Sequence, residues 1–153
     1  MIKICEFITY EEATKSNTGI KLGIKNNPPE EVFKKMQTLG LYVFDPVRRY
    51  FGVPIRVSSF YRCPELNKKI GGAKNSQHVT GEALDMEMSE NGHTNKELFD
   101  YVKTNMDFDQ LIWEFGDDNN PAWVHVSYKD AKNNRHQILR ARKISGKTIY
   151  AIY

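Results

Sequence analysis

Apolar residues recur with a helical period in the first half of the chain, at spacings of four, three and four residues: Val32, Met36, Leu39 and Val43. This period is typical of the buried face of a helix, which we expect to begin near Glu30. Pro28 and Pro29 lie directly before this helix. Prolines end any preceding secondary-structure element and are suited to the start of a helix. Gly40 weakens the predicted helix, and Pro46 is expected to kink or restart it.

Two further helices are indicated by their end signals. Pro64 suits the first position of a short helix over residues 65–70, which the glycine pair at 71–72 ends. Thr94 and Glu97 have the spacing of a capping box and predict a helix through Leu98 and Val102. We assign no element to the polar stretch that follows Thr9 and ends at residue 27.

Short runs rich in β-branched and aromatic residues predict six strands, over residues 54–58, 83–88, 110–115, 123–128, 137–144 and 148–152. A turn at Ser145–Gly146 separates the last two. Because helices come first and strands dominate later, we predict an α+β fold with a mainly antiparallel sheet and helices packed on one side of it. A length of 153 residues without repeats indicates one small domain over 1–153.

Composition excludes several classes of protein. The 22 basic and 19 acidic residues give a net charge of +3, without the dense basic stripe of a nucleic-acid binder, so we expect no nucleic-acid partner. The chain has neither a run of about 20 apolar residues nor a leader-like N-terminus. We therefore expect no membrane insertion and a protein that is cytoplasmic when synthesised. Cys5 and Cys63 are expected to be free thiols.

One segment contains residues suited to metal chemistry. His78 and Asp85 lie seven residues apart, so both can reach one ion only if the chain turns back between them, for which Gly81 is suited. His125 lies in the predicted strand 123–128, on the same face as Trp123. Two histidines, an aspartate and an open position make up a catalytic zinc site. By spacing alone, however, each histidine is equally well explained as a surface or hydrogen-bonded residue.

Several motifs occur together in one order: Ser59-Phe60-Tyr61-Arg62, Asn67, Gly71-Gly72-Ala73, Ser76-Gln77-His78, Gly81-Glu82-Ala83-Leu84-Asp85 and Trp123-Val124-His125-Val126-Ser127. Together they resemble the zinc D-Ala-D-Ala carboxypeptidase family of peptidoglycan peptidases, which includes L-alanyl-D-glutamate peptidases. The opening residues resemble a phage and bacterial branch. The resemblance implies an antiparallel sheet that floors a zinc cleft, as in the similar hedgehog signalling domain, and one zinc per chain on His78, Asp85 and His125.

Amide hydrolysis also needs a group that moves protons. Glu114 is our candidate for general base and acid, because it lies among bulky apolar residues where an unpaired carboxylate is costly. The alternative is an edge-strand glutamate that faces solvent; Asp109 is the second candidate. Many relatives have His-x-His at the late motif and an acidic residue three positions before the zinc histidine. This chain has Trp123 and Ala122 there, so no local motif assigns the base.

The remaining candidates concern the substrate. Arg62 is suited to pair bidentately with a peptide carboxylate, although a structural salt bridge would explain it equally well. The resemblance implies that Tyr61 and Ser76 also bind substrate, and Gln77 could offer hydrogen bonds; for Ser76, capping of a local turn is the alternative. The other two histidines, His93 and His136, are expected to be exposed. The basic run Arg140, Arg142 and Lys143 predicts a solvated face, with contact to anionic cell wall as an option.

The sequence thus predicts a zinc peptidase that cuts peptidoglycan stem peptides or crosslinks. A phage or prophage endolysin, released to the cell wall by a separate pore-forming protein, fits the absence of a leader. We expect a monomer. The alternative is a non-hydrolytic zinc-containing module of a phage particle or a cell-wall-associated protein. The orientation of Glu114 discriminates between the two. The motifs leave open which peptide bond is cut.

Overall fold

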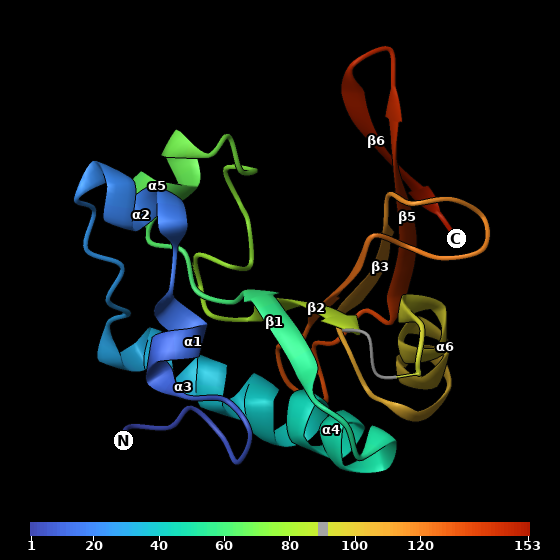
Figure 1. The fold of residues 1–153 in the computed structure, drawn as a ribbon, viewed down its shortest axis with the longest axis horizontal. Coiled ribbons are helices and arrows are strands. Elements are labelled where there is room, and N and C mark those ends of the chain that lie inside the picture. Colours follow the sequence, from blue (N-terminus) through green and yellow to red (C-terminus); the bar gives the residue numbers. More distant parts are fainter. Residues whose placement is uncertain (89–91) are drawn as a thin grey trace.

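A computed structural model describes residues 1–88 and 92–153 (Figure 1). The chain has an α+β fold, as predicted. Its helices are α1 (Tyr10–Thr14), α2 (Asn17–Leu22), α3 (Glu30–Leu39), the π-helix η1 (Gly40–Phe44), α4 (Asp45–Phe51), α5 (Pro64–Lys69) and α6 (Asn95–Asn105). Its strands are β1 (Ile55–Ser59), β2 (Ala83–Met88), β3 (Gln110–Glu114), β4 (Trp123–Ser127), β5 (Gln137–Ile144) and β6 (Lys147–Ile152).

The six strands form one sheet in the order β1-β2-β4-β3-β5-β6. Four of the neighbouring pairs are antiparallel, which confirms the prediction of a mainly antiparallel sheet. The exception is the pair β3 and β5, which is parallel. After β4, the chain passes to the far side of β3 and runs in the direction of β3 again, and β6 then returns as a hairpin.

The two faces of the sheet have different surroundings because side chains alternate along each strand. One face contributes apolar side chains to the core, among them Leu84, Met86, Leu111, Trp113, Val124 and Val126. These pack with residues of α3, η1, α4 and α6, such as Met36, Val43 and Phe99. Figure 1 shows α3, α4 and α6 along this side, with α2 and α5 beyond β1 and β2. The opposite face is therefore left to display polar side chains.

The predicted helix from Glu30 is continuous with the segment after it. Met36, Leu39 and Val43 are all fully buried, as the period indicates. At Gly40 the helix widens into η1, and α4 follows without a break. A Cβ at Gly40 would lie 2.7 Å from the side chain of Cys5, so glycine allows this close approach. Pro46 lies in the first turn of α4, where a missing N–H is tolerated.

The opening segment holds two short helices in the polar stretch for which no element is predicted. A capping box between Thr9 and Glu12 begins α1, and Ser16 caps α2. The capping signal predicted at Thr94 is half present: its hydroxyl accepts a hydrogen bond from the backbone N–H of Glu97. The side chain of Glu97 pairs with His93 instead. The observed ends of all six strands and of α5 lie within one residue of the predicted ends.

Cys5 and Cys63 are both free thiols, as predicted. Among residues 1–88 and 92–153, no helix is long and apolar enough to cross a membrane.

Candidate metal centre and active-site cleft

Three side chains that could hold a metal ion come together on the polar side of the sheet. His78 lies in the loop after α5, Asp85 lies in β2 and His125 lies in β4. The register of β2 and β4 places Asp85 directly opposite His125. One ligand atom from each of the three residues lies within 4.8 Å of the other two. In the part of the chain that the structure describes, this is the only such group of three or more residues.

Both histidines point a ring nitrogen at the same carboxylate oxygen. His78 Nε2 lies 3.3 Å from Asp85 Oδ1, and His125 Nδ1 lies 2.9 Å from it. The other nitrogen of His78, Nδ1, donates a hydrogen bond to the carbonyl oxygen of Phe60 at 2.7 Å. Such a bond fixes both the orientation of the ring and the nitrogen that faces the site.

These residues fit a metal ion on chemical grounds. Because Nδ1 of His78 is a donor, Nε2 of a neutral ring carries a lone pair that faces the Asp85 carboxylate. A cation between two such acceptors would stabilise the arrangement. Nε2 of His125 is buried and has no hydrogen-bond partner among the described residues. Burial alone would raise the pKa of Asp85, but His78 and His125 hold it well below its ordinary value. The His–Asp–His group could therefore hold zinc.

The loop that carries His78 turns back where the sequence predicts it. Gly81 has a φ of +74°, a left-handed conformation that favours glycine. A Cβ at this position would lie 2.8 Å from the backbone oxygen of Val32 in α3, so the turn also packs closely against the helix. The hydroxyl of Ser76 accepts a hydrogen bond from the backbone N–H of His78. The loop geometry thus brings His78 back over Asp85.

Glu114 ends β3 on the face that carries His125. Ile112 lies opposite His125 in the antiparallel pair, and Glu114, two residues further on, shares that face. Its side chain lines the cleft rather than facing bulk solvent, and only 6% of the residue is exposed. No described residue donates a hydrogen bond to its carboxylate. The pKa of Glu114 is raised to about 7, mainly by burial; His125 lowers the pKa and Asp85 raises it, both by smaller amounts.

A cleft of about 790 Å³ contains the metal centre and Glu114. Its other lining residues include Arg62, Ser76, Gln77, Trp123, Lys129, Arg135, Leu139 and Tyr150. A second recess of about 480 Å³ adjoins it, and Arg62 and Asp85 line both. Tyr61 is buried and lines this second recess rather than the main cleft. The candidate metal ligands thus all line the main cleft, and Asp85 is the only one of them that also lines the second recess.

The guanidinium group of Arg62 has few hydrogen-bond partners among the described residues. Its Nη2 donates a long hydrogen bond of 3.4 Å to the hydroxyl of Ser76, and its buried Nε has no partner among the described residues. No carboxylate of the described chain forms an ion pair with it, so the alternative of a structural salt bridge finds no support. Burial lowers the pKa of Arg62, while Asp85 raises it. Asn67 packs against Gly72, which lines the cleft, and its amide donates a hydrogen bond to the carbonyl oxygen of Ala73.

Asp109, the second candidate for the base, is paired with other side chains, unlike Glu114. It is fully buried and binds Arg135 through two side-chain hydrogen bonds of 2.9 and 2.8 Å. It also accepts a hydrogen bond from the amide of Gln77 at 2.9 Å. Burial would raise the pKa of Asp109, but these bonds lower it to about 2. This geometry gives Asp109 a structural part, because it ties the loop before His78 to the segment before β5.

The other polar candidates lie outside the metal centre. His93 pairs with Glu97, and the exposed His136 pairs with Asp107. Arg140 differs from the predicted solvated face: its guanidinium lies over the ring of Trp113 and pairs with Asp118, because β5 packs beside β3.

Two contributors to the site were not found from the sequence. The amide of Asn26 donates to the carbonyls of Thr14 and Tyr61, and its oxygen accepts from the backbone N–H of Cys63. It therefore fixes the segment that carries Arg62. Tyr150 lines the cleft from the C-terminal hairpin. The sequence offered no signal for either residue, because both act through contacts distant along the chain.

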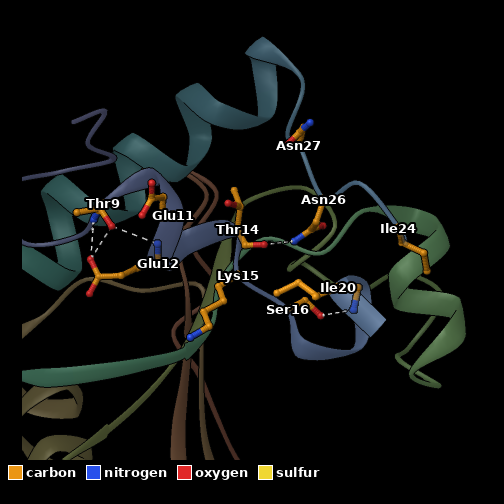
Figure 2. A pocket seen from close by; sticks show the side chains of 11 residues that line it. Thr9, Glu11, Glu12, Thr14, Lys15, Ser16, Ile20, Ile24, Asn26 and Asn27 are labelled. Atoms are coloured by element: carbon orange, nitrogen blue, oxygen red, sulfur yellow. Dashed lines mark hydrogen bonds between the residues drawn. The ribbon is translucent and has the colours of Figure 1, made fainter. Parts of the chain in front are cut away.

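A further pocket, of about 600 Å³, lies between α1, α2 and the segment up to Asn27 (Figure 2). Its polar side chains mostly serve the local structure. Thr9 and Ser16 cap helices, and Asn26 holds the carbonyl of Thr14, as the dashed lines show. Among the described residues, no group of three or more possible metal ligands lines it.

Comparison with models of protein families gives a match over most of the chain. The model of the family described as Peptidase M15 matches residues 6–127, which include His78, Asp85, Glu114 and His125. No curated protein matches the chain significantly. Strands β5 and β6 lie beyond the matched residues.

Proposed function

The chain belongs to the peptidase M15 family, and from this membership and its cleft we propose that it is a zinc peptidase that hydrolyses peptide bonds of peptidoglycan. One observation carries the proposal: the buried, unpaired carboxylate of Glu114 lies in the same cleft as His78, Asp85 and His125. Stem peptides or crosslinks are the substrate that the sequence motifs favour.

His78, Asp85 and His125 would hold the zinc ion. Zinc in such a site lowers the pKa of a water molecule and polarises a carbonyl group. The protein's own contribution is to fix these ligands: the Phe60 carbonyl orients His78, and the strand register places Asp85 against His125.

Glu114 is the residue we propose to move protons. Its carboxylate takes a proton from the attacking water as the new C–O bond forms. It then delivers this proton to the amine nitrogen as the C–N bond breaks, so that the carboxylate is regenerated. Burial raises the pKa of this carboxyl group to about 7 in the metal-free protein, and this raised pKa suits a group that must accept a proton and then release it. The alternative of a non-hydrolytic module would be favoured by a Glu114 that faced solvent, whereas this residue lines the cleft.

Arg62 is proposed to orient the peptide. Its unpaired donors lie between the two recesses, where a peptide carboxylate could bind bidentately. Ser76 holds both the guanidinium and the backbone of His78. A peptide that bound Arg62 would thus be aligned with the metal centre. The second recess, which shares Arg62 and Asp85 with the cleft, offers space for further peptide residues and favours cleavage within a peptide over removal of a terminal residue.

The proposed place of action is the bacterial cell wall, reached after release by a phage lysis system. This part of the proposal rests on the motifs that resemble phage and bacterial relatives, and a monomer suffices for it, because all the proposed site residues come from one chain.

Digestion of purified peptidoglycan sacculi tests the proposal. We expect the wild type with zinc to release peptide fragments, and mass spectrometry of the new amine ends identifies the bond. Glu114→Gln should reduce the rate by about 10²–10⁴-fold while the protein still binds zinc. Glu31→Gln, on the exposed first turn of α3, is the matched control and should digest like the wild type. A wild type that binds zinc but releases no fragments would support the binding module instead.

A further inference from the structure

The C-terminal hairpin adds a wall to the cleft. Strands β5 and β6 pair antiparallel around a turn in which Ser145 and Gly146 both have positive φ. β5 pairs with β3, so the hairpin extends the sheet beside the strand that carries Glu114. Figure 1 shows it rising at the edge of the sheet. Leu139 and Tyr150 of this hairpin line the cleft.

The register fixes the face on which Tyr150 lies. Glu114 pairs with Ala141 of β5, and Ala141 pairs with Tyr150 of β6. The three residues form one row across the sheet, on the side that carries His125. The residue between the other two is alanine, whose small side chain leaves room above it. Tyr150 can therefore reach toward the cleft although it lies two strands from Glu114.

The hydroxyl of Tyr150 is available for a ligand. The residue is 54% exposed, and no described residue forms a hydrogen bond with the hydroxyl. Burial of the phenol raises the pKa of Tyr150, as do the carboxylates of Glu114 and Asp85, while Arg62 lowers it. The hydroxyl thus keeps its proton at neutral pH and is a donor. A half-exposed aromatic ring with a free donor, within electrostatic reach of three groups of the cleft, is suited to contact a bound peptide.

We propose that Tyr150 is a substrate-binding residue of the peptidase, whose ring forms one wall of the cleft and whose hydroxyl donates a hydrogen bond to a backbone carbonyl of the peptide. This proposal rests on the proposed function. It makes the hairpin, which lies outside the residues matched by the family, part of the substrate site. Substrate preference would then depend on β6 as well as on Arg62.

The test combines binding with turnover. Binding of a purified disaccharide-tetrapeptide muropeptide is measured by calorimetry in the Glu114→Gln background, in which turnover is slow. Adding Tyr150→Phe should raise Kd about 3- to 10-fold, the effect of one hydrogen bond, and Tyr150→Ala should raise it further. In otherwise wild-type protein, Tyr150→Phe should raise KM more than it lowers kcat on the same muropeptide. Zinc content should be unchanged in all variants.

Ile149→Ala is the matched control. Ile149 is exposed and directly precedes Tyr150 in β6, so its side chain lies on the opposite face of the strand. It should bind and digest like the wild type. Tyr150→Phe with an unchanged Kd and KM, in a protein whose wild type digests the muropeptide, would overturn the role of Tyr150 alone. A wild type that neither binds nor cuts muropeptides or sacculi would instead overturn the proposed function, and the role of Tyr150 with it.

Discussion

In the metal-free protein, replacing Glu114 with glutamine should increase the free energy of unfolding relative to the wild type as the pH rises from 4.5 to 7. Burial raises the pKa of Glu114 to about 7, from an ordinary value of 4.5. Below pH 4.5 the carboxyl group is protonated in both the folded and the unfolded chain, so its ionisation adds nothing to the free energy of unfolding. Between pH 4.5 and 7 the unfolded chain loses this proton while the folded chain keeps it, and the wild type becomes less stable.

The size of this effect follows from the distance between the two pKa values. A pKa raised by about 2.5 corresponds to about 3 kcal/mol of lost stability above pH 7, since each unit equals about 1.4 kcal/mol. For a protein of this size, that difference is about 6–12 °C in Tm. The titratable groups that interact with Glu114 are His125 from β4, Asp85 from β2 and Tyr150 from β6, and Arg62 lines the same cleft. They are present in both proteins, so their own titration largely cancels in the comparison.

The assay is urea unfolding of the wild type and Glu114→Gln at pH values from 4 to 8.5, with a chelator present. A buried glutamine adds a constant offset, because its amide also lacks partners. The diagnostic quantity is therefore the change with pH: the variant should gain about 3 kcal/mol relative to the wild type between pH 4.5 and 7. A difference that stays constant over this range, or that changes in the wild type's favour, would refute the reasoning that Glu114 is buried and unpaired.

Two other substitutions test how the cleft is built. Gly81→Ala should lower the free energy of unfolding by about 2–4 kcal/mol, because its Cβ meets α3 and its φ is positive. Gly23→Ala, with positive φ but open space, should cost only about 1 kcal/mol, and equal losses in urea unfolding would contradict the packing argument. Asp109→Asn should cost about 2–3 kcal/mol, because Arg135 loses its buried partner, and should weaken zinc binding through the loop that carries His78. Unchanged stability and unchanged zinc affinity in that variant would show that Asp109 supports neither.

Much of the fold could be predicted from local patterns. Alternation along 123–127 places Trp123 and His125 on one face, and in the structure this strand pairs antiparallel with β3. The turn at Gly81 could also be predicted, since seven residues that begin and end at one site must reverse direction. Helices α1 and α2 were missed because both are very short and their sequence is polar, although the Thr9–Glu12 capping pattern was visible.

The remainder of the site depends on contacts between residues far apart in sequence. Nothing near Asp109 shows that Arg135, 26 residues later, will pair with it. Likewise, Tyr150 reaches the cleft only because β5 pairs with β3 in parallel, which no local pattern encodes. Sequence motifs indicated which residue types meet at the metal centre, whereas strand order determined which other side chains surround it.

The metal content of the purified protein tests the central claim most directly. Protein prepared without chelators and dialysed against metal-free buffer is analysed for zinc by mass spectrometry, alongside His125→Ala and, as control, His136→Ala at an exposed position. We predict one zinc ion per chain in the wild type and the control, and almost none in His125→Ala. A wild type without zinc, or a His125→Ala variant that keeps a full equivalent, would contradict the assignment of His78, Asp85 and His125 as the metal centre.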